Sequence, residues 1–130
     1  MSDLFRSFTA SSSGMEAQAR RLRHVSENIA NADTPGYRRK TVDFHTEVDR
    51  ASGATRVATG PVQIDPRDLP LIHDPGHALA NEDGFYEGST VDVMIEIADA
   101  REASRSYEAN LRAFDQTRQM AQSLLDLLRR

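Results

Sequence analysis

Two histidines with an aspartate between them come nearest to a metal-binding or catalytic pattern in this sequence. His73 and His77 stand four residues apart, and Asp74 follows the first. On a helix this spacing would place both imidazoles on one face, but Pro75 and Gly76 between them exclude helical geometry. No third ligand stands at a recognisable spacing. We therefore interpret the segment as a structural turn. A small metal-dependent hydrolase is a third hypothesis, which tight retention of zinc after chelation would support.

Other reactive side chains lack the partners that catalysis needs. Glu47 with Asp49, and Glu82 with Asp83, are neighbouring carboxylates, but no apolar pocket is indicated that would shift their pKa values for acid–base work. The serines at 11–13 have no base at a readable position, and no GxSxG, P-loop or GxGxxG motif occurs. The sequence has no cysteine, which removes thiol nucleophiles, disulfides and thiolate metal sites. We predict a protein that is not an enzyme and that needs no cofactor or metal.

The composition argues against several kinds of partner. The chain has 130 residues, of which 38% are hydrophobic and 28% charged, and its net charge is −4. A mildly acidic protein lacks the positive field that phosphate binding needs, so we expect no nucleic-acid partner. The one basic cluster, residues 38–40, is expected to pair with carboxylates of a neighbouring subunit. No apolar run is long enough for a membrane span, and the first residues resemble no cleaved signal, so any export is expected to use another route.

Residues 1–34 are predicted to form an N-terminal helix. Apolar residues recur at alternating spacings of four and three, which is typical of a helix that packs against another helix. The residues of this stripe that we expect to pack between subunits are Leu22, Val25 and Ile29. Because serines and Gly14 weaken its start, we expect residues 15–32 to be firmly helical and residues 3–14 to be helical only with a partner. The helix is expected to stop at a turn formed by Asn31, Thr34, Pro35, Gly36 and Tyr37.

Residues 91–130 are predicted to form a longer C-terminal helix. Asp92 is a candidate N-cap, and neither proline nor glycine follows Thr90. The apolar stripe keeps its spacing over five heptads, and its candidates for subunit packing are Ile97, Tyr107, Leu111, Phe114, Leu125 and Leu128. A second stripe lies beside the first and widens the apolar face: Met94, Ala98, Met120, Leu124 and Leu127.

The middle of the chain, residues 35–90, differs from both ends. All five prolines and six of the seven glycines lie between residues 33 and 90. Short alternating segments at 55–59 and 61–64 are typical of edge strands or of a small hairpin closed by Gly60 and Pro61. Because its apolar side chains are few and scattered, this irregular extension is not expected to bury much.

The lengths of the two helices indicate that the chain needs partners. Helices of about 30 and 38 residues would be roughly 45 and 57 Å long, whereas a compact chain of 100 residues has a radius of gyration near 13 Å. Two such helices paired with each other leave the second stripe exposed, and wide apolar faces indicate further helices. We predict a mainly α fold: two long terminal helices form a coiled-coil-like pair and one domain, with a small irregular or β-containing middle.

Three segments carry a resemblance that covers essentially the whole chain. The stretch SENIANADTPGYRRKTVDF, residues 26–44, resembles the ANxxTPGY signature of flagellar rod, hook and hook-associated proteins. The block at residues 73–80, which contains Asp74, Pro75, Gly76 and His77, resembles the DPGHPLA block of FlgC-type proximal rod proteins. Residues 97–120 are similar to the SRSYxAN helix of the same family. Ala78 stands where the family usually has proline, and residues 88–92 replace its common PNVN.

The resemblance implies a structural subunit of the bacterial flagellar basal-body rod that assembles helically, transmits torque and lines the export channel. The implied partners are further copies of this chain, FlgB-, FlgF-, FlgG- and FliE-type subunits, and the flagellar type III export apparatus. The implied location is the basal body within the periplasm, reached without a cleaved signal. The alternative is a freestanding coiled-coil adaptor that binds one partner helix in a groove and would form a stable, defined dimer.

Overall fold

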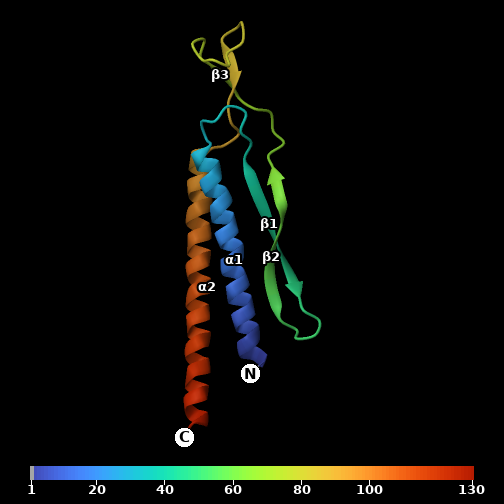
Figure 1. Cartoon of the computed structure of the whole chain (residues 1–130), viewed down its shortest axis with the longest axis vertical. Helices are drawn as coiled ribbons and strands as arrows, with labels where there is room; N and C mark the ends of the chain where they lie inside the picture. The colour runs from blue at the N-terminus through green and yellow to red at the C-terminus, as the bar shows by residue number, and fades with distance from the viewer. Residues whose placement is uncertain (1) are drawn as a thin grey trace.

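The computed structural model describes residues 2–130 as an elongated arrangement of two helices and two small hairpins (Figure 1). The helices lie side by side and antiparallel, and the longer hairpin runs along the side of the first helix that faces away from the second. The predicted fold class, mainly α with terminal helices and a small β-containing middle, is confirmed. In chain order the elements are α1 (Ser2–Ala30), β1 (Lys40–Val48), β2 (Thr55–Ile64), β3 (Leu71–His73), β4 (Phe85–Glu87) and α2 (Val93–Leu128).

Small residues form the contact between the two helices. The buried positions include Ser11, Gly14 and Ala17 on α1 and Ala103 on α2. A Cβ atom on Gly14 would lie only 2.7 Å from the side-chain nitrogen of Asn110, so the Asn110 side chain fills the space beside Gly14 and would have to move for a larger residue. The large apolar residues of α2 therefore lie mostly beside this contact.

Local interactions explain where the helices begin. The Asp92 side chain accepts a hydrogen bond from the backbone nitrogen of Met94 at 3.0 Å, so the predicted N-cap of α2 is confirmed. In α1 the hydroxyls of Ser11 and Ser13 bond back to carbonyls of the preceding turn, which accommodates these residues inside a helix. The helix is continuous from Ser2, and its early turns pack against α2 of the same chain.

The turn of the long hairpin does not lie at Gly60 and Pro61. Strands β1 and β2 are antiparallel, and the chain reverses at residues 49–54, where the nitrogen of Gly53 (φ +67°) bonds the carbonyl of Asp49. Gly60 and Pro61 lie inside β2, opposite Asp43, where the register shifts. Of the two alternatives for these segments, the hairpin closed by Gly60 and Pro61 was wrong, whereas the edge-strand alternative agrees with β2. A bulge and a turn favour the same residue types, because each accommodates a flexible residue and a proline that lacks an N–H donor.

Polar contacts attach the hairpin to α1. The Ser13 hydroxyl accepts a bond from the nitrogen of Val57 at 2.9 Å, and the Arg20 guanidinium donates to the Thr59 hydroxyl at 3.0 Å. Nearer the turn, the Arg6 guanidinium donates to the carbonyl of Ser52 at 3.1 Å. The helix thus has one side on α2 and another side on the hairpin.

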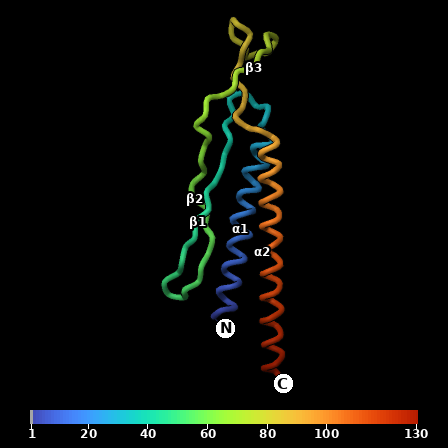
Figure 2. The backbone as a smooth tube through the Cα atoms, turned by 180° about the vertical axis from the view of Figure 1, so that it is seen from behind, coloured from blue at the N-terminus to red at the C-terminus, as the bar shows by residue number. Residues whose placement is uncertain are grey.

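A second, much smaller hairpin lies beyond the junction of the helices, and we call residues 71–87 the knob. Its strands β3 and β4 pair antiparallel, and its loop contains the predicted turn. The Asp74 carboxylate accepts a bond from the nitrogen of Gly76, and His77 Nδ1 accepts one from Leu79, so both side chains brace the loop. Figure 2 shows the knob at the end of the molecule opposite both chain termini.

Candidate functional site: the helix junction and the open faces of the helices

The loop that ends α1 turns the chain back toward the helix. The Asn31 side chain donates to the carbonyl of Glu27, and the Thr34 hydroxyl donates to the Asn31 side-chain oxygen at 3.1 Å. Gly36 has φ +76°, a conformation that glycine adopts without strain. This reversal brings Tyr37 back over the last turns of α1, so the predicted stop motif does end the helix.

Asn28 is the centre of the junction. Its side chain is completely buried and makes four hydrogen bonds, which satisfy its full capacity. Its amide nitrogen donates to the carbonyl of Lys40 at 2.9 Å and to Glu96 Oε2 at 3.2 Å. Its oxygen accepts from the Tyr37 hydroxyl at 2.9 Å and from the nitrogen of Lys40 at 3.0 Å. One side chain therefore joins α1, the start of β1 and α2.

Tyr37 completes this connection from the loop. Burial raises the pKa of its phenol above the usual value, and the nearby carboxylates of Glu27 and Glu96 raise it further. The phenol therefore stays protonated at neutral pH and keeps its donor for Asn28. The motif tyrosine acts as a hydrogen-bond donor to the helix that it follows.

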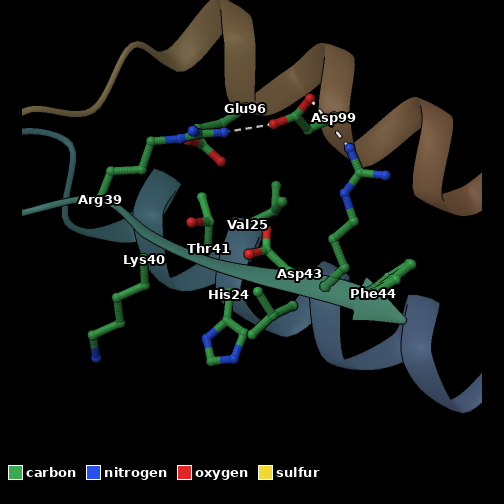
Figure 3. A pocket seen from close by; sticks show the side chains of 11 residues that line it. His24, Val25, Arg39, Lys40, Thr41, Asp43, Phe44, Glu96 and Asp99 are labelled. Carbon is green, nitrogen blue, oxygen red and sulfur yellow. Dashed lines mark hydrogen bonds and ion pairs between the residues drawn. The ribbon is translucent and has the colours of Figure 1, made fainter. Parts of the chain in front are cut away.

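Glu96 is a fully buried carboxylate on the first turn of α2, and it is neutralised by Arg39 (Figure 3). The Arg39 Nε atom donates to Glu96 Oε1, and its terminal nitrogen donates to Asp99 at 2.6 Å. Arg21 of α1 reaches the other oxygen of Asp99 at 3.4 Å and Glu102 at 3.5 Å. Arginines from α1 and from the residue just before β1 thus meet carboxylates of α2, and the charges pair within the chain.

This ion-pair cluster borders a cleft of about 280 Å³. Its charged groups are occupied by one another, so the arrangement suits fixing three elements together better than binding a ligand. A buried ion pair adds little net stability compared with apolar packing, but loss of one partner leaves an unpaired charge, which is costly. We therefore expect a shift in the register of the helices to cost stability, because it would leave these charges unpaired.

The basic residues 38–40 bond to groups of their own chain. We expected them to pair with a neighbouring subunit, but Arg39 binds Glu96 and Asp99, and Lys40 lies 3.7 Å from Glu27. Arg38 donates to carbonyls of the same chain. The turn at Pro35 and Gly36 brings these cations back onto their own helices, which the linear sequence does not show.

A second set of contacts joins the stop loop to the segment before α2. The nitrogen of Thr90 bonds the carbonyl of Tyr37 at 3.0 Å, and the nitrogen of Gly36 bonds the carbonyl of Gly88 at 3.1 Å. The Ser89 hydroxyl donates to the carbonyl of Ala32. The helix ends are thus tied together even though about 60 residues separate them in the chain.

The predicted packing seam divides into buried and open residues. Val25 is buried, and the ring of Phe114 packs edge-on against Phe8, with ring centroids 5.0 Å apart. Leu22 and Ile97 are partly exposed. The remaining seam residues are exposed, by 36–81% of their surface: Ile29, Tyr107, Leu111, Leu125 and Leu128.

The second stripe of α2 is also open. Met94 is 73% exposed and Met120 56%, and Leu124 and Leu127 are exposed as well. Apolar surface of this extent along a helix indicates a binding face. Both stripes of α2 therefore remain available to partners, and their use in subunit packing is a prediction.

The histidine pair singled out in the sequence lies on the knob. Within residues 2–130, no group of three metal-ligating side chains comes together. His73 packs edge-on against Phe85, and His77 stacks on Tyr86 at 3.8 Å, so each imidazole has an aromatic partner. Among the helices of residues 2–130, neither is apolar over a long enough stretch to cross a bilayer.

These features define a class of protein: an elongated structural subunit whose terminal helices are joined at one end by a buried polar junction, and whose α2 carries exposed apolar stripes along its length. Two family models match the chain, "Flagella basal body rod protein" at residues 8–38 and "Flagellar basal body rod FlgEFG protein C-terminal" at residues 82–127.

Full-length relatives give the particular family. A "Flagellar basal-body rod protein FlgC" of Agrobacterium fabrum is 49% identical over 124 residues, which cover 90% of this chain and 89% of the relative. Proteins of the same name from Salmonella typhimurium and Bacillus subtilis are 32% and 30% identical, over 92% and 95% of this chain and 94% and 97% of theirs. The chain belongs to the FlgC-type family of flagellar basal-body rod proteins.

The sequence resemblance to this family is therefore confirmed. The sequence predicts the stop motif but not the roles of Asn28 and Glu96. Asn28 accepts a hydrogen bond from the motif's Tyr37 and donates one to Glu96 of α2. Asn28 lies on the same face of α1 as the buried Ala17 and Val25, and a polar residue on that face was the available signal.

Proposed function

We propose that this chain is a structural subunit of the flagellar rod whose terminal helices pack side by side with those of neighbouring subunits. The observation that carries the proposal is the open apolar surface on α2, which the chain's own α1 and hairpin leave uncovered. Family membership supports the same role. A structural role also fits the junction, where the charges are paired internally, and no reaction is proposed for it.

Within the rod, the partners would be further copies of this chain and subunits of the FlgB, FlgF, FlgG and FliE types. The long helices would lie around the axial channel, and the rigid junction would pass torque from one subunit to the next. The chain would reach the periplasm unfolded through the flagellar type III export apparatus. Open helix faces support this path, because they gain their full packing only on assembly.

The adaptor alternative is not favoured. An adaptor would need one groove for one helix, whereas α2 offers two open stripes and the relatives are rod proteins. A purified chain that forms a stable, defined dimer would support the adaptor.

Leu111→Asp tests the proposed role. Leu111 is 41% exposed in the single chain, so the substitution should leave the fold of the chain intact. It places a carboxylate on the face that we expect to pack against a neighbour. An unpaired charge buried on assembly costs about 3 kcal/mol or more, a factor of roughly a hundred in the binding equilibrium. We expect loss of motility and of the chain from purified basal bodies.

Val48→Asp is the matched control, because Val48 is 60% exposed and lies on the hairpin. Both variants should keep the helical circular-dichroism signal of the parent chain. Phe114→Asp should also block assembly, but it breaks the contact with Phe8 and so weakens the chain too. Full motility of the Leu111 variant would overturn the proposal.

A further inference from the structure

A histidine holds the loop of the knob through a hydrogen bond that only its neutral form can make. His77 Nδ1 accepts from the backbone nitrogen of Leu79 at 3.1 Å. An imidazole that accepts at Nδ1 carries its proton on Nε2, so this bond belongs to the neutral ring. A second proton would occupy Nδ1 and make it a donor, which cannot bond another N–H group. Protonation of His77 therefore breaks the contact with Leu79.

The ring itself keeps its place when it is charged. It stacks on Tyr86 of β4, with the ring centroids 3.8 Å apart and the planes 8° from parallel. The face of a tyrosine ring attracts a cation at this distance, so a charged imidazole retains its partner. The loop, and not the ring, is consequently the part that moves.

The charges around His77 are mostly negative. Besides His77, the titratable groups of the knob are His73, Asp74, Glu82, Asp83, Tyr86 and Glu87. Residues 71–87 contain no lysine or arginine, so within the knob only a charged His73 would repel a second proton on His77. The stop loop contributes Pro35 and Gly36 to the cleft that it shares with the knob, and neither is charged. Histidine ordinarily gains its second proton between pH 8 and 5, so the contact with Leu79 is lost within this range.

The residue that this bond holds forms one edge of an apolar cleft. The cleft measures about 380 Å³ and lies at the end of the molecule opposite both termini, with Leu71, Leu79 and Phe85 in its lining (Figure 2). Leu79 is 64% exposed, so its backbone, more than its side-chain packing, decides where it lies. A turn of the peptide before Leu79 therefore changes the shape of the cleft.

Two backbone bonds confine the movement. The nitrogen of His77 donates to the carbonyl of Asp74, and the nitrogen of Ala80 donates to the carbonyl of His77, each at 3.0 Å. Neither bond involves the imidazole, so both persist when the ring is protonated. The change is thus limited to the peptide between Ala78 and Leu79, and the rest of the knob stays folded.

We propose that His77 is a pH-sensitive brace of the knob. The neutral ring holds the backbone of Leu79 and with it the edge of the cleft, whereas the protonated ring stays on Tyr86 and releases them. The cleft therefore has one shape at neutral pH and another at mildly acidic pH. This property belongs to the single chain and does not depend on the role proposed for it in the rod.

Asparagine at position 77 keeps the brace and removes the titration. Three carboxylates of this chain, on Asp49, Asp65 and Asp74, accept from the backbone nitrogen two residues further on, as His77 does. An asparagine oxygen can make the same bond and does not ionise. His77→Asn is therefore the test variant. His73→Asn is its matched control, because it removes the other imidazole of the knob.

Nuclear magnetic resonance of the full chain tests the brace, in a stabilising osmolyte between pH 8 and 5. In the parent and in His73→Asn, we expect the chemical shift of the Leu79 amide to titrate with the same midpoint as the His77 ring. Its protection against hydrogen exchange, relative to an unstructured peptide at the same pH, should fall roughly fivefold, which is the factor that one net hydrogen bond contributes.

In His77→Asn, both the shift and the protection of the Leu79 amide should stay constant over this pH range. A Leu79 amide in the parent chain that does not follow the His77 ring would overturn the inference. So would a Leu79 amide that titrates equally in His77→Asn, because the titrating group would then be another one.

Discussion

Replacing Asn28 by alanine removes the side chain that joins α1, β1 and α2. The alanine cannot bond the Tyr37 hydroxyl, either backbone group of Lys40, or Glu96. Glu96 keeps Arg39, and Tyr37 and Lys40 are partly exposed, so water can replace some of the lost partners.

The magnitude follows from these four bonds. Each contributes about 1 kcal/mol net, and groups left without a partner in a buried site cost about 1–3 kcal/mol. Since water reaches part of the junction, we expect Asn28→Ala to lower the free energy of unfolding by about 3–4 kcal/mol. A loss of this size is a large part of the stability of a small domain, which is roughly 5–15 kcal/mol.

Asn31→Ala is the matched control. It is the same substitution three residues away, and it removes two local hydrogen bonds in a partly exposed loop, so we expect a loss of about 1 kcal/mol. Glu96→Gln tests the charge separately, because glutamine keeps the shape while removing the charge that faces Arg39.

The assay is urea unfolding of the purified chains, followed by far-ultraviolet circular dichroism in a stabilising osmolyte, which favours the folded state of each variant. The expected order of stability is the parent chain, then Asn31→Ala, then Asn28→Ala. Equal losses for the two asparagine variants would refute the reasoning that Asn28 is the centre of the junction.

Three further outcomes follow from single contacts. Gly14→Val should destabilise the helix pair by about 1–3 kcal/mol, and Asn110→Ala should recover part of this in thermal unfolding; no loss would contradict the close approach. Hydrogen bonds from the Arg67 side chain and backbone lower the pKa of Asp65 to about 2. That carboxylate therefore stabilises the fold above its unfolded pKa near 3.9, and the contribution is lost as pH falls toward 2; an NMR titration midpoint near 3.9 would count against the pair. The raised pKa of Tyr37 should place its absorbance titration above that of an exposed tyrosine, and an ordinary midpoint would contradict its burial.

The helices and their ends were predictable because their signals are local. The stripe spacing, the Asp92 cap and the turn formers from Asn31 to Tyr37 act within a few residues, and the structure follows them. The turn of the long hairpin was not predictable in the same way. A turn and a bulge both favour residues such as Gly60 and Pro61, and only the pairing with β1 distinguishes them.

The residues between the helices could not be predicted from periodicity. A stripe shows which face is apolar, but not which part of it meets the same chain. Gly14 and Ala103 lie in the contact between the two helices, whereas Leu111 is exposed. Asn28 and Glu96 were missed because a polar residue is expected at the surface. The burial of Glu96 depends on Arg39, and that of Asn28 on Tyr37, Lys40 and Glu96, which the fold brings together.

An electron-microscopy reconstruction of the basal body with this chain placed in it would test the central claim most directly. We predict that the chain occupies the rod, with the open stripes of α2, including Tyr107 and Leu111, against helices of neighbouring subunits. A reconstruction in which the chain lies outside the rod, or in which these stripes face solvent, would contradict the account.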